Sequence, residues 1–364
     1  MVVVSSKSLI VQKPKHLSVT WAQKILQQNC NPQNIKAHVD TVDISAVDVG
    51  TTTRVRLAVE HNVTHLPKHW FVKLPSLSMR AKAITALPRL LPTEVRFYKQ
   101  LADAVPVNKP TVLAAHSQFG LGSTLVMSDI SEWGARPGHP GDALSVDQAY
   151  LVVEQLARFH AHFMTKAQAP AFKWLAGPVR SLEDLLGTAL AVPLMRRGLR
   201  LAGDRVPVSL HESAMTYARH REQMMRFLSA STPTVVHHDC HPGNLFWHKG
   251  QPGFLDWQMV RIGEGIGDIS YFLATSLTPE MRRKHDTDLV KYYYEVMRSQ
   301  SRFKVNFEHL FMRYRAHLAY AFEAMVVTLA VGDMMNLDSN LEMIRRSALA
   351  AEDHQTFLLL PKVT

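Results

Sequence analysis

The chain has 364 residues, of which 46% are hydrophobic and 20% are charged, so its composition is that of a globular protein rather than a collagenous or low-complexity one. A chain of this length can bury a sizeable core and usually divides into two domains or lobes. The best candidate for a membrane span, Ala324–Val331, is far shorter than the roughly 20 residues that such a helix requires. Lysines interrupt the N-terminal apolar residues where a secretory signal needs a continuous stretch. Two cysteines, Cys30 and Cys240, are too few for a disulfide framework. We therefore expect a soluble, cytoplasmic protein with reduced thiols and no membrane span.

The net charge of +10 belongs mainly to the first third of the chain. Residues 1–109 contain 15 Lys and Arg against 6 Asp and Glu, whereas the remaining 255 residues contain 26 against 25. The basic residues occur singly, and there is no tract of about five to eight of them to indicate a nucleic-acid partner. This pattern is typical of a solvated basic face, and attraction of an anionic ligand such as a nucleotide is the alternative.

The first third of the chain has the pattern of a mostly antiparallel sheet with one important helix. A capping box formed by Thr20 and Gln23 predicts a short first helix that ends near residue 28. Apolar and polar residues then alternate, as in half-buried strands, and residues 49–53 fit a hairpin turn. A helix from about Thr93 would carry Glu94 in its first turn, and the strand before it carries Lys73. Strands are expected around residues 42–44, 55–59, 69–74, 111–115 and 123–127.

After a Gly- and Pro-rich stretch at residues 134–141, helical spacing dominates the sequence. A compact non-helical island at residues 234–258 interrupts the helices with three short, apolar, strand-like pieces. The sequence therefore predicts an α-rich second part after a β-rich first part. Helices are expected at about residues 145–164, 181–191, 208–229, 279–299, 307–335 and 341–351.

The island contains the residue types that phosphoryl transfer requires. Asp239 and Asn244 lie five positions apart, and Asp256 ends the next apolar strand. In such a reaction one Asp accepts the proton of the acceptor hydroxyl, while an Asn and a second Asp hold Mg²⁺, which prefers oxygen ligands. A strand Lys and a helix Glu complete the grip on the phosphates, and Lys73 and Glu94 lie on elements of these types in this order.

The island resembles the aminoglycoside phosphotransferase and choline kinase superfamily. His237-His238-Asp239 with Asn244 is similar to its H-G-D-x-x-x-x-N pattern, except that His238 replaces the usual Gly, and Leu255-Asp256-Trp257 is similar to the strand end that follows. Asp256-Trp-Gln258 and Gly267-Asp-Ile-Ser-Tyr-Phe-Leu273 resemble the ecdysteroid-kinase-like branch and its bacterial relatives. Looser similarities lie in Leu125–Ile130 and Leu156–His162.

The resemblance implies an α+β, protein-kinase-like fold of two lobes. The expected parts are an N-terminal nucleotide-binding lobe at residues 1–127, a hinge at 128–133, and a C-terminal catalytic and acceptor-binding lobe at 134–364. The resemblance also implies an enzyme, a small-molecule kinase that uses ATP and Mg²⁺ to phosphorylate a hydroxyl group of its acceptor.

The expected site residues divide by role. Asp239 is the expected base, and Asn244 and Asp256 are the expected Mg²⁺ ligands. Contacts to the nucleotide are expected from Lys73, its partner Glu94, the loop residues Gly50 and Thr51, and backbone groups around Ser128 and Ile130.

Simpler interpretations of the same residues are open. The His and Cys residues of 237–241 could form a zinc cluster, but near-consecutive side chains point in different directions and no second pair of ligands follows. Singly, the Asp and Asn residues of the island fit turns. Lys73 could be a solvated strand residue, and Glu94 could be a first-turn carboxylate favoured by the helix dipole. Asp268 is expected to brace the catalytic loop.

The motifs do not specify the acceptor. Residues 278–364 contain 12 Lys and Arg and 11 Asp and Glu, so they offer no acidic basin for a polycationic aminoglycoside. Their Tyr, Phe and Met residues, which also suit a helical core, favour an apolar alcohol such as a sterol, a terpenoid or a macrolide. An aminoglycoside-type antibiotic kinase of the same fold and a non-catalytic nucleotide-binding relative are the alternatives, and a Cys- or zinc-dependent hydrolase is a more distant one.

Overall fold

The computed structural model describes residues 6–30, 37–78, 89–167 and 169–362. Residue contacts divide the chain into two units. The first unit consists of Met1–Ala104, Asn108–Arg136 and Leu255–Gln258, and the second of Val105–Val107, Pro137–Phe254 and Met259–Thr364. The first is built on a β-sheet and the second mainly on helices, so the chain has the α+β, two-part construction that its sequence predicts.

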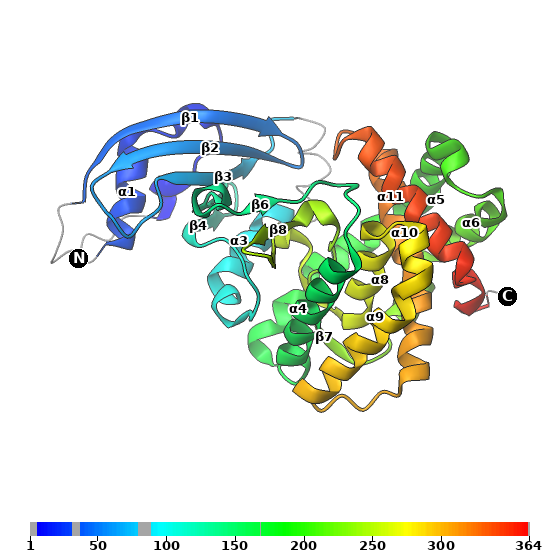
Figure 1. Cartoon of the computed structure of the whole chain (residues 1–364). Coiled ribbons are helices and arrows are strands. Elements are labelled where there is room, and N and C mark those ends of the chain that lie inside the picture. The colour runs from blue at the N-terminus through cyan, green and yellow to red at the C-terminus, as the bar shows by residue number, and fades with distance from the viewer. Residues whose placement is uncertain (1–5, 31–36, 79–88, 168, 363–364) are drawn as a thin grey trace. The chain divides into compact units, whose positions relative to one another are not determined.

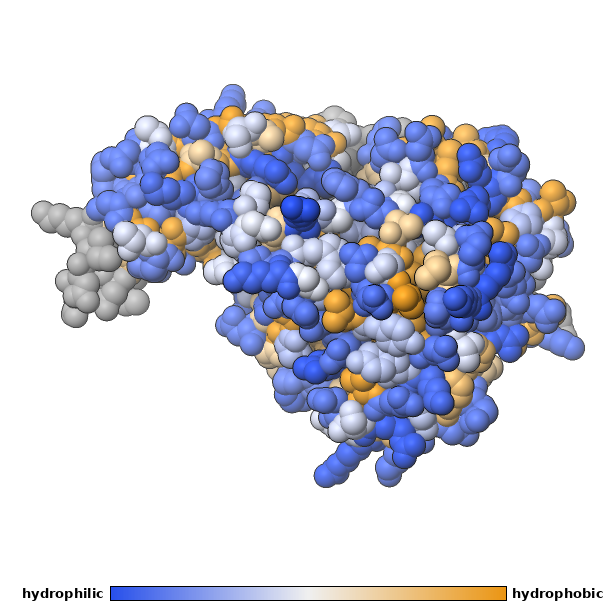
Figure 2. Space-filling model, viewed as in Figure 1, coloured by the Kyte–Doolittle hydropathy of each residue, from blue (hydrophilic) through white to orange (hydrophobic). Residues whose placement is uncertain are grey.

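The sheet of the first unit is antiparallel throughout, with the strand order β1-β2-β3-β5-β4 (Figure 1). The expected strands are confirmed, and several are longer than the sequence pattern indicates. β1 is an edge strand whose side chains are mostly exposed, and Figure 2 shows apolar surface along it, to which Ile44, Val47 and Val49 contribute. The bounds are β1 (Val39–Val49), β2 (Thr52–His61), β3 (His69–Pro75), β4 (Val112–Gln118) and β5 (Gly122–Ser128).

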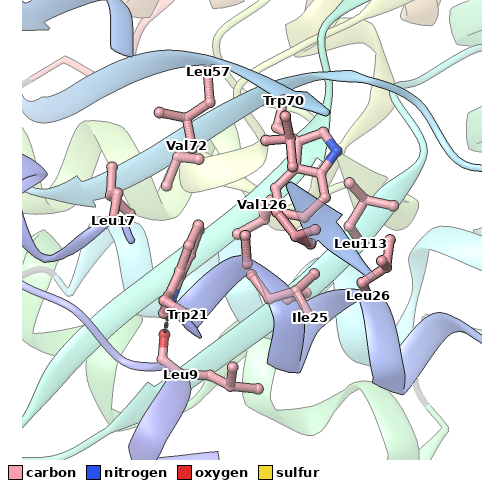
Figure 3. Close-up of a cluster of buried hydrophobic side chains, with 14 of the residues drawn as sticks. Leu9, Leu17, Trp21, Ile25, Leu26, Leu57, Trp70, Val72, Leu113 and Val126 are labelled. Atoms are coloured by element: carbon pink, nitrogen blue, oxygen red, sulfur yellow. Dashed lines mark hydrogen bonds between the residues drawn. The ribbon is translucent and has the colours of Figure 1, made fainter. Parts of the chain in front are cut away.

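Helix α1 (Val19–Asn29) packs on one face of this sheet and closes a hydrophobic core (Figure 3). Trp21 meets Trp70 of β3 edge to face, with ring centroids 6.2 Å apart, and its Nε1 donates to the carbonyl of Leu9 at 3.1 Å. Trp70, Val72 and Leu74 all belong to this core. Because successive side chains of a strand point to opposite faces, Lys73 faces the other side of the sheet.

Helices α1 and α3 of the first unit begin earlier than predicted. Ser18, rather than Thr20, caps α1 by accepting a hydrogen bond from the Trp21 N–H at 3.3 Å. The side chain of Gln23 instead accepts from the Val39 N–H of β1 at 2.8 Å, so it does not complete a capping box. Helix α3 (Leu90–Gln100) packs against β3, β4 and β5 and begins three residues before Thr93.

The second unit is organised around helix α8 (Gly265–Ser276), of whose 12 residues 11 are buried. A helix that is buried on all sides lies in the interior of its domain, and α8 packs against α4, α10 and α11. The prediction of a single helix at 208–229 is wrong, because the helix is interrupted at His220 and forms two shorter helices, α6 and α7. The helix bounds are α4 (Val146–Met164), α5 (Pro178–Ala202), α6 (His211–Arg219), α7 (Arg221–Leu228), α9 (Pro279–Gln300), α10 (Phe307–Val331) and α11 (Leu337–Asp353).

Short strands hold the island in the second unit. β7 (Pro233–Val236) pairs with β10 (Arg261–Glu264), and β8 (Leu245–His248) forms a hairpin with β9 (Gln251–Phe254). The two-residue strand β6 (Arg136–Pro137) neighbours β8. The strand-like pieces expected in the island are therefore confirmed, whereas β10 and α8 were not predicted as elements.

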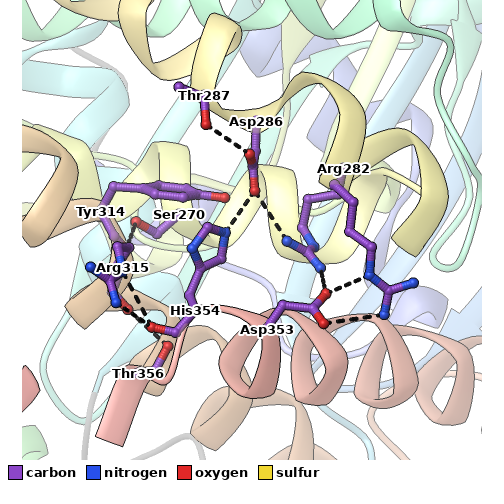
Figure 4. A network of polar contacts seen from close by, with 10 residues as sticks. Ser270, Arg282, Asp286, Thr287, Tyr314, Arg315, Asp353, His354 and Thr356 are labelled. Carbon is purple, nitrogen blue, oxygen red and sulfur yellow. Dashed lines mark hydrogen bonds and ion pairs between the residues drawn. The ribbon is translucent and has the colours of Figure 1, made fainter. Parts of the chain in front are cut away.

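A polar network joins α9 to α11 (Figure 4). Arg282 and Arg283 both pair with Asp353, the latter through Nε at 2.7 Å. Asp286 accepts hydrogen bonds from Arg282 Nη1 at 3.1 Å and from His354 Nε2 at 2.7 Å. No helix within the described ranges combines the length and the apolar character needed to cross a membrane.

Candidate active site

Lys73 of β3 lies between two carboxylates within the first unit. Its Nζ is 2.9 Å from both carboxylate oxygens of Glu94 and 3.0 Å from Oδ1 of Asp256. The side chains of Lys73 and Glu94 are almost fully buried. Lys73 is therefore not a solvated strand residue, and Glu94 is not a first-turn carboxylate, since α3 begins at Leu90. The structure brings together three of the predicted site residues.

The charges of this triad are unbalanced. Burial is the main influence on Glu94 and raises its pKa to about 7; the charge of Lys73 opposes this rise and that of Asp256 adds to it. For Lys73, burial alone would lower the pKa, but the charges of Asp256 and Glu94 outweigh it, so the pKa is raised and the amine stays protonated. One cation thus faces two carboxyl groups, of which Glu94 is partly protonated near neutral pH, and carboxylate oxygens of this kind suit a hard divalent cation.

Asp256 reaches Lys73 from a strained turn. Its backbone φ is 58°, in the left-handed region that Asp tolerates better than most residues. The next residue, Trp257, stacks on Phe97 of α3 with ring centroids 4.2 Å apart and an interplanar angle of 8°. This stack fixes the Asp256 turn to the helix that carries Glu94.

The β1–β2 turn contains the predicted loop residues Gly50 and Thr51. The carbonyl of Gly50 accepts a hydrogen bond from Ser76 Oγ at 2.7 Å, which ties the turn to the end of β3. Thr51 and Ser76 belong to the lining of a cavity of about 390 Å³. Neither Lys73 nor Glu94 is among the described residues that line this cavity. The loop residues therefore lie in a different part of the first unit from the triad of Lys73, Glu94 and Asp256.

Ser128 ends β5, and Ile130 begins the turn that follows. The N–H of Ser128 donates to the Thr111 carbonyl at 2.8 Å, and Ser128 Oγ accepts from the Thr111 N–H at 3.2 Å. The Ile130 carbonyl accepts from the Ala135 N–H at 3.1 Å. The backbone of this segment is thus already tied into the first unit, and Ser128 N–H is committed to Thr111.

Asp239 lies in the second unit, where two side chains orient its carboxylate. Asn244 Nδ2 donates to Oδ2 and to the backbone carbonyl of Asp239, each at 2.9 Å. The hydroxyl of Tyr271 donates to Oδ1 at 2.8 Å. Burial, with the negative charge of Asp239, holds the pKa of Tyr271 well above its ordinary value, so the phenol keeps the proton that it donates. Because Asn244 Nδ2 is committed to Asp239, the amide oxygen of Asn244 is the atom suited to a metal ion.

Asp268 of α8 braces the backbone of the same loop, as expected. It accepts the His237 N–H at 2.7 Å and the His238 N–H at 2.8 Å, and it lies 3.1 Å from His160 Nε2. His160 is in turn 3.1 Å from the hydroxyl of Tyr293. Burial would raise the pKa of Asp268, but the hydrogen bond and charge of His160 and the neighbouring His237 outweigh it and lower the pKa. A buried, ionised carboxylate therefore anchors the loop that presents Asp239.

His238 has a backbone φ of 71°, a left-handed conformation that glycine adopts freely. A side chain in this region typically costs about 1 kcal/mol or more. The histidine ring stacks on Tyr320 of α10, with ring centroids 4.3 Å apart and an interplanar angle of 21°. The positive φ explains in physical terms why Gly is the usual residue before the Asp in this pattern.

The side chains of 237–241 point in different directions, whereas the ligands of a zinc ion would have to converge on one point. His238 turns to Tyr320, His241 Nδ1 accepts from the Gly243 N–H at 3.1 Å, and Cys240 is buried and unpaired with another cysteine. Throughout the parts of the chain that the structure describes, no group of three or more His, Cys, Asp or Glu side chains is arranged to hold a metal ion.

Tyr271 and His160 contribute to the site and lie in the segments Gly267–Leu273 and Leu156–His162, whose resemblance was noted, but neither was predicted as a site residue. Tyr271 follows Asp268 by three positions on α8, and residues three apart share one helix face, so the motif itself could have placed both side chains on the catalytic loop. His160 lies in the expected helix 145–164, but nothing in its local sequence indicates a partner 108 residues away.

The fold of the chain is similar to the folds of solved phosphotransferase structures. The GDP complex of aminoglycoside 2′-phosphotransferase-IIIa has a TM-score of 0.50 at 15% identity, with 93% of this chain and 98% of that chain covered. A putative aminoglycoside phosphotransferase from Ralstonia eutropha JMP134 also has a TM-score of 0.50, at 12% identity, with 94% and 98% covered. At these identities the likeness shows the fold alone, which is that of the kinase-like small-molecule phosphotransferases. The choline kinase LicA from Streptococcus pneumoniae has a TM-score of 0.48 at 13% identity, with 91% and 99% covered.

No curated protein sequence matches the chain. The sequence profile of the ecdysteroid kinase-like family, in contrast, matches residues 49–305, which is more than half of the chain and includes Lys73, Glu94, Asp239, Asn244 and Asp256. The chain therefore belongs to the ecdysteroid kinase-like family.

Proposed function

We propose that the protein is a kinase that transfers the γ-phosphoryl group of ATP to a hydroxyl group of an uncharged small molecule. The observation that carries this proposal is the carboxylate of Asp239, oriented by Asn244 and Tyr271 on a loop that is anchored at its backbone. A carboxylate held by two side-chain donors has a fixed direction in which to meet an acceptor hydroxyl. The family and the fold support the same chemistry.

In this reaction the acceptor oxygen attacks the γ-phosphorus and forms the new P–O bond. The bond from the γ-phosphorus to the bridging oxygen breaks, and ADP leaves with its electron pair. Asp239 orients the acceptor hydroxyl and accepts its proton. Lys73, held in place by Glu94, contacts the phosphates, and backbone groups around Ser128 and Ile130 are proposed to meet the adenine, with Gly50 and Thr51 near the phosphates.

Asn244 and Asp256 are the residues proposed to hold Mg²⁺, which would neutralise charge on the phosphates when it is bound. The donor set fits this ion, since it consists of an amide oxygen and a carboxylate, and the triad around Lys73 has one more carboxylate than cations. ATP is proposed over GTP on the resemblance to small-molecule kinases. The GDP in the solved neighbour makes GTP the nucleotide to compare.

The support for an uncharged acceptor differs from the composition argument. Several of the aromatic and Met residues of 278–364 that suggested an apolar pocket, such as Tyr293, Tyr314, Phe322 and Met325, are buried in the packing of the helices. Tyr320 lies near Asp239, because its ring is 6.1 Å from that of Tyr271, which donates to Asp239. Support for the acceptor class therefore rests on the surroundings of Tyr320.

The experiment is an activity screen of the full-length chain with Mg²⁺ and ATP or GTP. The acceptors are a steroid polyol, a terpenoid alcohol, a macrolide and kanamycin, and phosphorylated product is detected by mass spectrometry. We expect product from an uncharged alcohol, and a loss of turnover of about 10²–10⁴-fold in Asp239→Asn. Asp204→Asn is the matched control, because the side chain of Asp204 is 97% exposed. Product from kanamycin alone would contradict the acceptor class, and full turnover in Asp239→Asn would contradict the role of Asp239.

A further inference from the structure

His238 keeps a side chain where the backbone favours none. Its φ of 71° lies in the left-handed region, and the residue is half-buried immediately before Asp239. Glycine would occupy this position without steric conflict. A residue held in a sparsely populated conformation next to a site is a reason to look for a function of its side chain.

The ring of His238 is fixed on one face and open to hydrogen bonding at its edge. One face stacks on Tyr320 at 4.3 Å. Within the described ranges, neither ring nitrogen of His238 has a hydrogen-bonding partner. Burial, followed by the charge of Arg261, holds the pKa of His238 well below its ordinary value. The ring is therefore neutral at physiological pH, with one nitrogen that donates and one that accepts.

Three arginine–carboxylate pairs lie around this stack. Arg261 donates to both carboxylate oxygens of Asp184, at 3.0 and 2.6 Å. Arg221 Nε donates to Glu323 at 2.5 Å. The remaining pair consists of Arg180 and Glu183. Three carboxylates are thus matched by three guanidinium groups. The carboxylate of Asp239, whose charge also acts on Tyr320, instead accepts hydrogen bonds from Asn244 and Tyr271.

We propose that His238 is a specificity-determining residue, and that its ring and the ring of Tyr320 form an aromatic surface beside Asp239 that receives an uncharged acceptor. The ring faces cover apolar carbon atoms of the acceptor, and a ring nitrogen of His238 forms a hydrogen bond with one of its oxygens. A polycationic acceptor needs unpaired carboxylates, which the three arginine pairs remove. This inference rests on the proposed function and names the acceptor-contacting residues of the same site.

The chain offers a matched control for the backbone effect. Lys249, in the turn between β8 and β9, also has a positive φ of 48°, and it is exposed. Lys249→Gly relieves the same kind of backbone strain as His238→Gly without touching the aromatic surface. A change seen in His238→Gly but not in Lys249→Gly therefore belongs to the imidazole.

The experiment measures equilibrium binding of a steroid polyol and of kanamycin to the full-length chain by calorimetry, at low and high salt. We expect the steroid polyol to bind with an affinity that salt does not change, and kanamycin not to bind. His238→Gly and Tyr320→Leu should each weaken steroid binding by about 3- to 10-fold, whereas Lys249→Gly should leave it unchanged. His238→Phe, which keeps the ring and removes both nitrogens, should lie between wild type and His238→Gly.

Wild-type affinity in both His238→Gly and Tyr320→Leu would overturn the proposal, as would salt-sensitive binding of kanamycin alone or no binding of the steroid polyol. Thermal unfolding shows which variants fold, and His238→Phe and Tyr320→Leu carry the test if His238→Gly does not. Binding of the steroid polyol without any phosphorylated product would contradict the proposed function, but it would not contradict the role of the aromatic surface in binding. Product formation with an unchanged acceptor KM in His238→Gly would support the proposed function and contradict the role of His238.

Discussion

The buried carboxylate of Asp268 should be the most sensitive position of the catalytic loop. In Asp268→Asn the shape is kept, but one of the two oxygens becomes an NH₂ group, which cannot accept a hydrogen bond. If the remaining oxygen keeps His237 N–H and His160, the His238 N–H loses its acceptor. Loss of one charge-assisted hydrogen bond costs about 1.5–3 kcal/mol, and conversion of the other two from charged to neutral costs about 1 kcal/mol each. We therefore expect the free energy of unfolding of the second unit to fall by about 3.5–5 kcal/mol.

The assay is equilibrium unfolding in urea, followed by tryptophan fluorescence and circular dichroism, with Asp204→Asn as the exposed control. The same variant should lose phosphoryl transfer, because the loop that presents Asp239 is no longer anchored. Tyr293→Phe removes the hydroxyl that contacts His160 and leaves Asp268 unchanged. It should have a much smaller effect on both the free energy of unfolding and phosphoryl transfer. An Asp268→Asn protein whose unfolding free energy lies within about 1 kcal/mol of wild type would refute the claim that this carboxylate holds the loop.

Three further predictions concern single carboxylates. Asp256→Asn keeps a residue that tolerates the positive φ but removes the charge that faces Lys73, so Mg²⁺-dependent turnover should be lost while the chain stays folded; wild-type kcat in magnesium buffer would contradict this role. Glu94 has a folded pKa of about 7, raised from its ordinary 4.5, so its contribution to stability is present below about pH 4.5 and is lost as the pH rises through about 7. The thermal midpoint of the first unit should therefore fall over this pH range, and it should not fall in Glu94→Gln. An equal pH dependence of the midpoint in the two proteins would argue against a raised pKa of Glu94. For Asp286, burial would raise the pKa, but the hydrogen bond from His354 and the charge of Arg282 lower it, so its contribution to stability is present above the ordinary pKa and is lost as the pH falls through the lower, folded value. Asp286→Asn should lower the free energy of unfolding by about 1.5–3 kcal/mol at pH 7 in a urea titration and should make stability less dependent on acid pH. An unchanged midpoint of acid unfolding would show that the network does not depend on this charge.

Local patterns predicted the elements well where the residues that decide an element are neighbours in sequence. The alternation of β2 and the helical spacing of the apolar residues of α4 are of this kind, and both elements are found. The start of α3 was placed three residues late, and Pro92 lies in the first turn of the helix. A proline in the first turn is tolerated, since its missing N–H has no partner there in any case. The break between α6 and α7 lies within one continuous helical periodicity, so the pattern could not reveal it.

The site was predictable as residue types but not as contacts. The spacing of Asp239 and Asn244 indicates the chemistry, and their hydrogen bond spans only five residues. The pairing of Lys73 with Glu94 and Asp256 depends on how β3, α3 and a distant turn pack, which no local pattern encodes. The left-handed backbone of His238 is likewise a property of the folded loop, because histidine itself carries no signal for it.

The first unit is not contiguous in sequence, and this has a consequence for its folding during synthesis. Residues up to Arg136 contain the whole sheet, whereas Leu255–Gln258 emerges roughly 120 residues later. At about 5–20 residues per second, translation of that interval takes about 6–24 s. During this time the nascent sheet holds Lys73 and Glu94 without Asp256, and Phe97 without the ring of Trp257 that stacks on it. The helix that carries Glu94 is thus assembled against an incomplete partner, and the last four residues of the unit complete both its ion triad and its aromatic packing in a single late step.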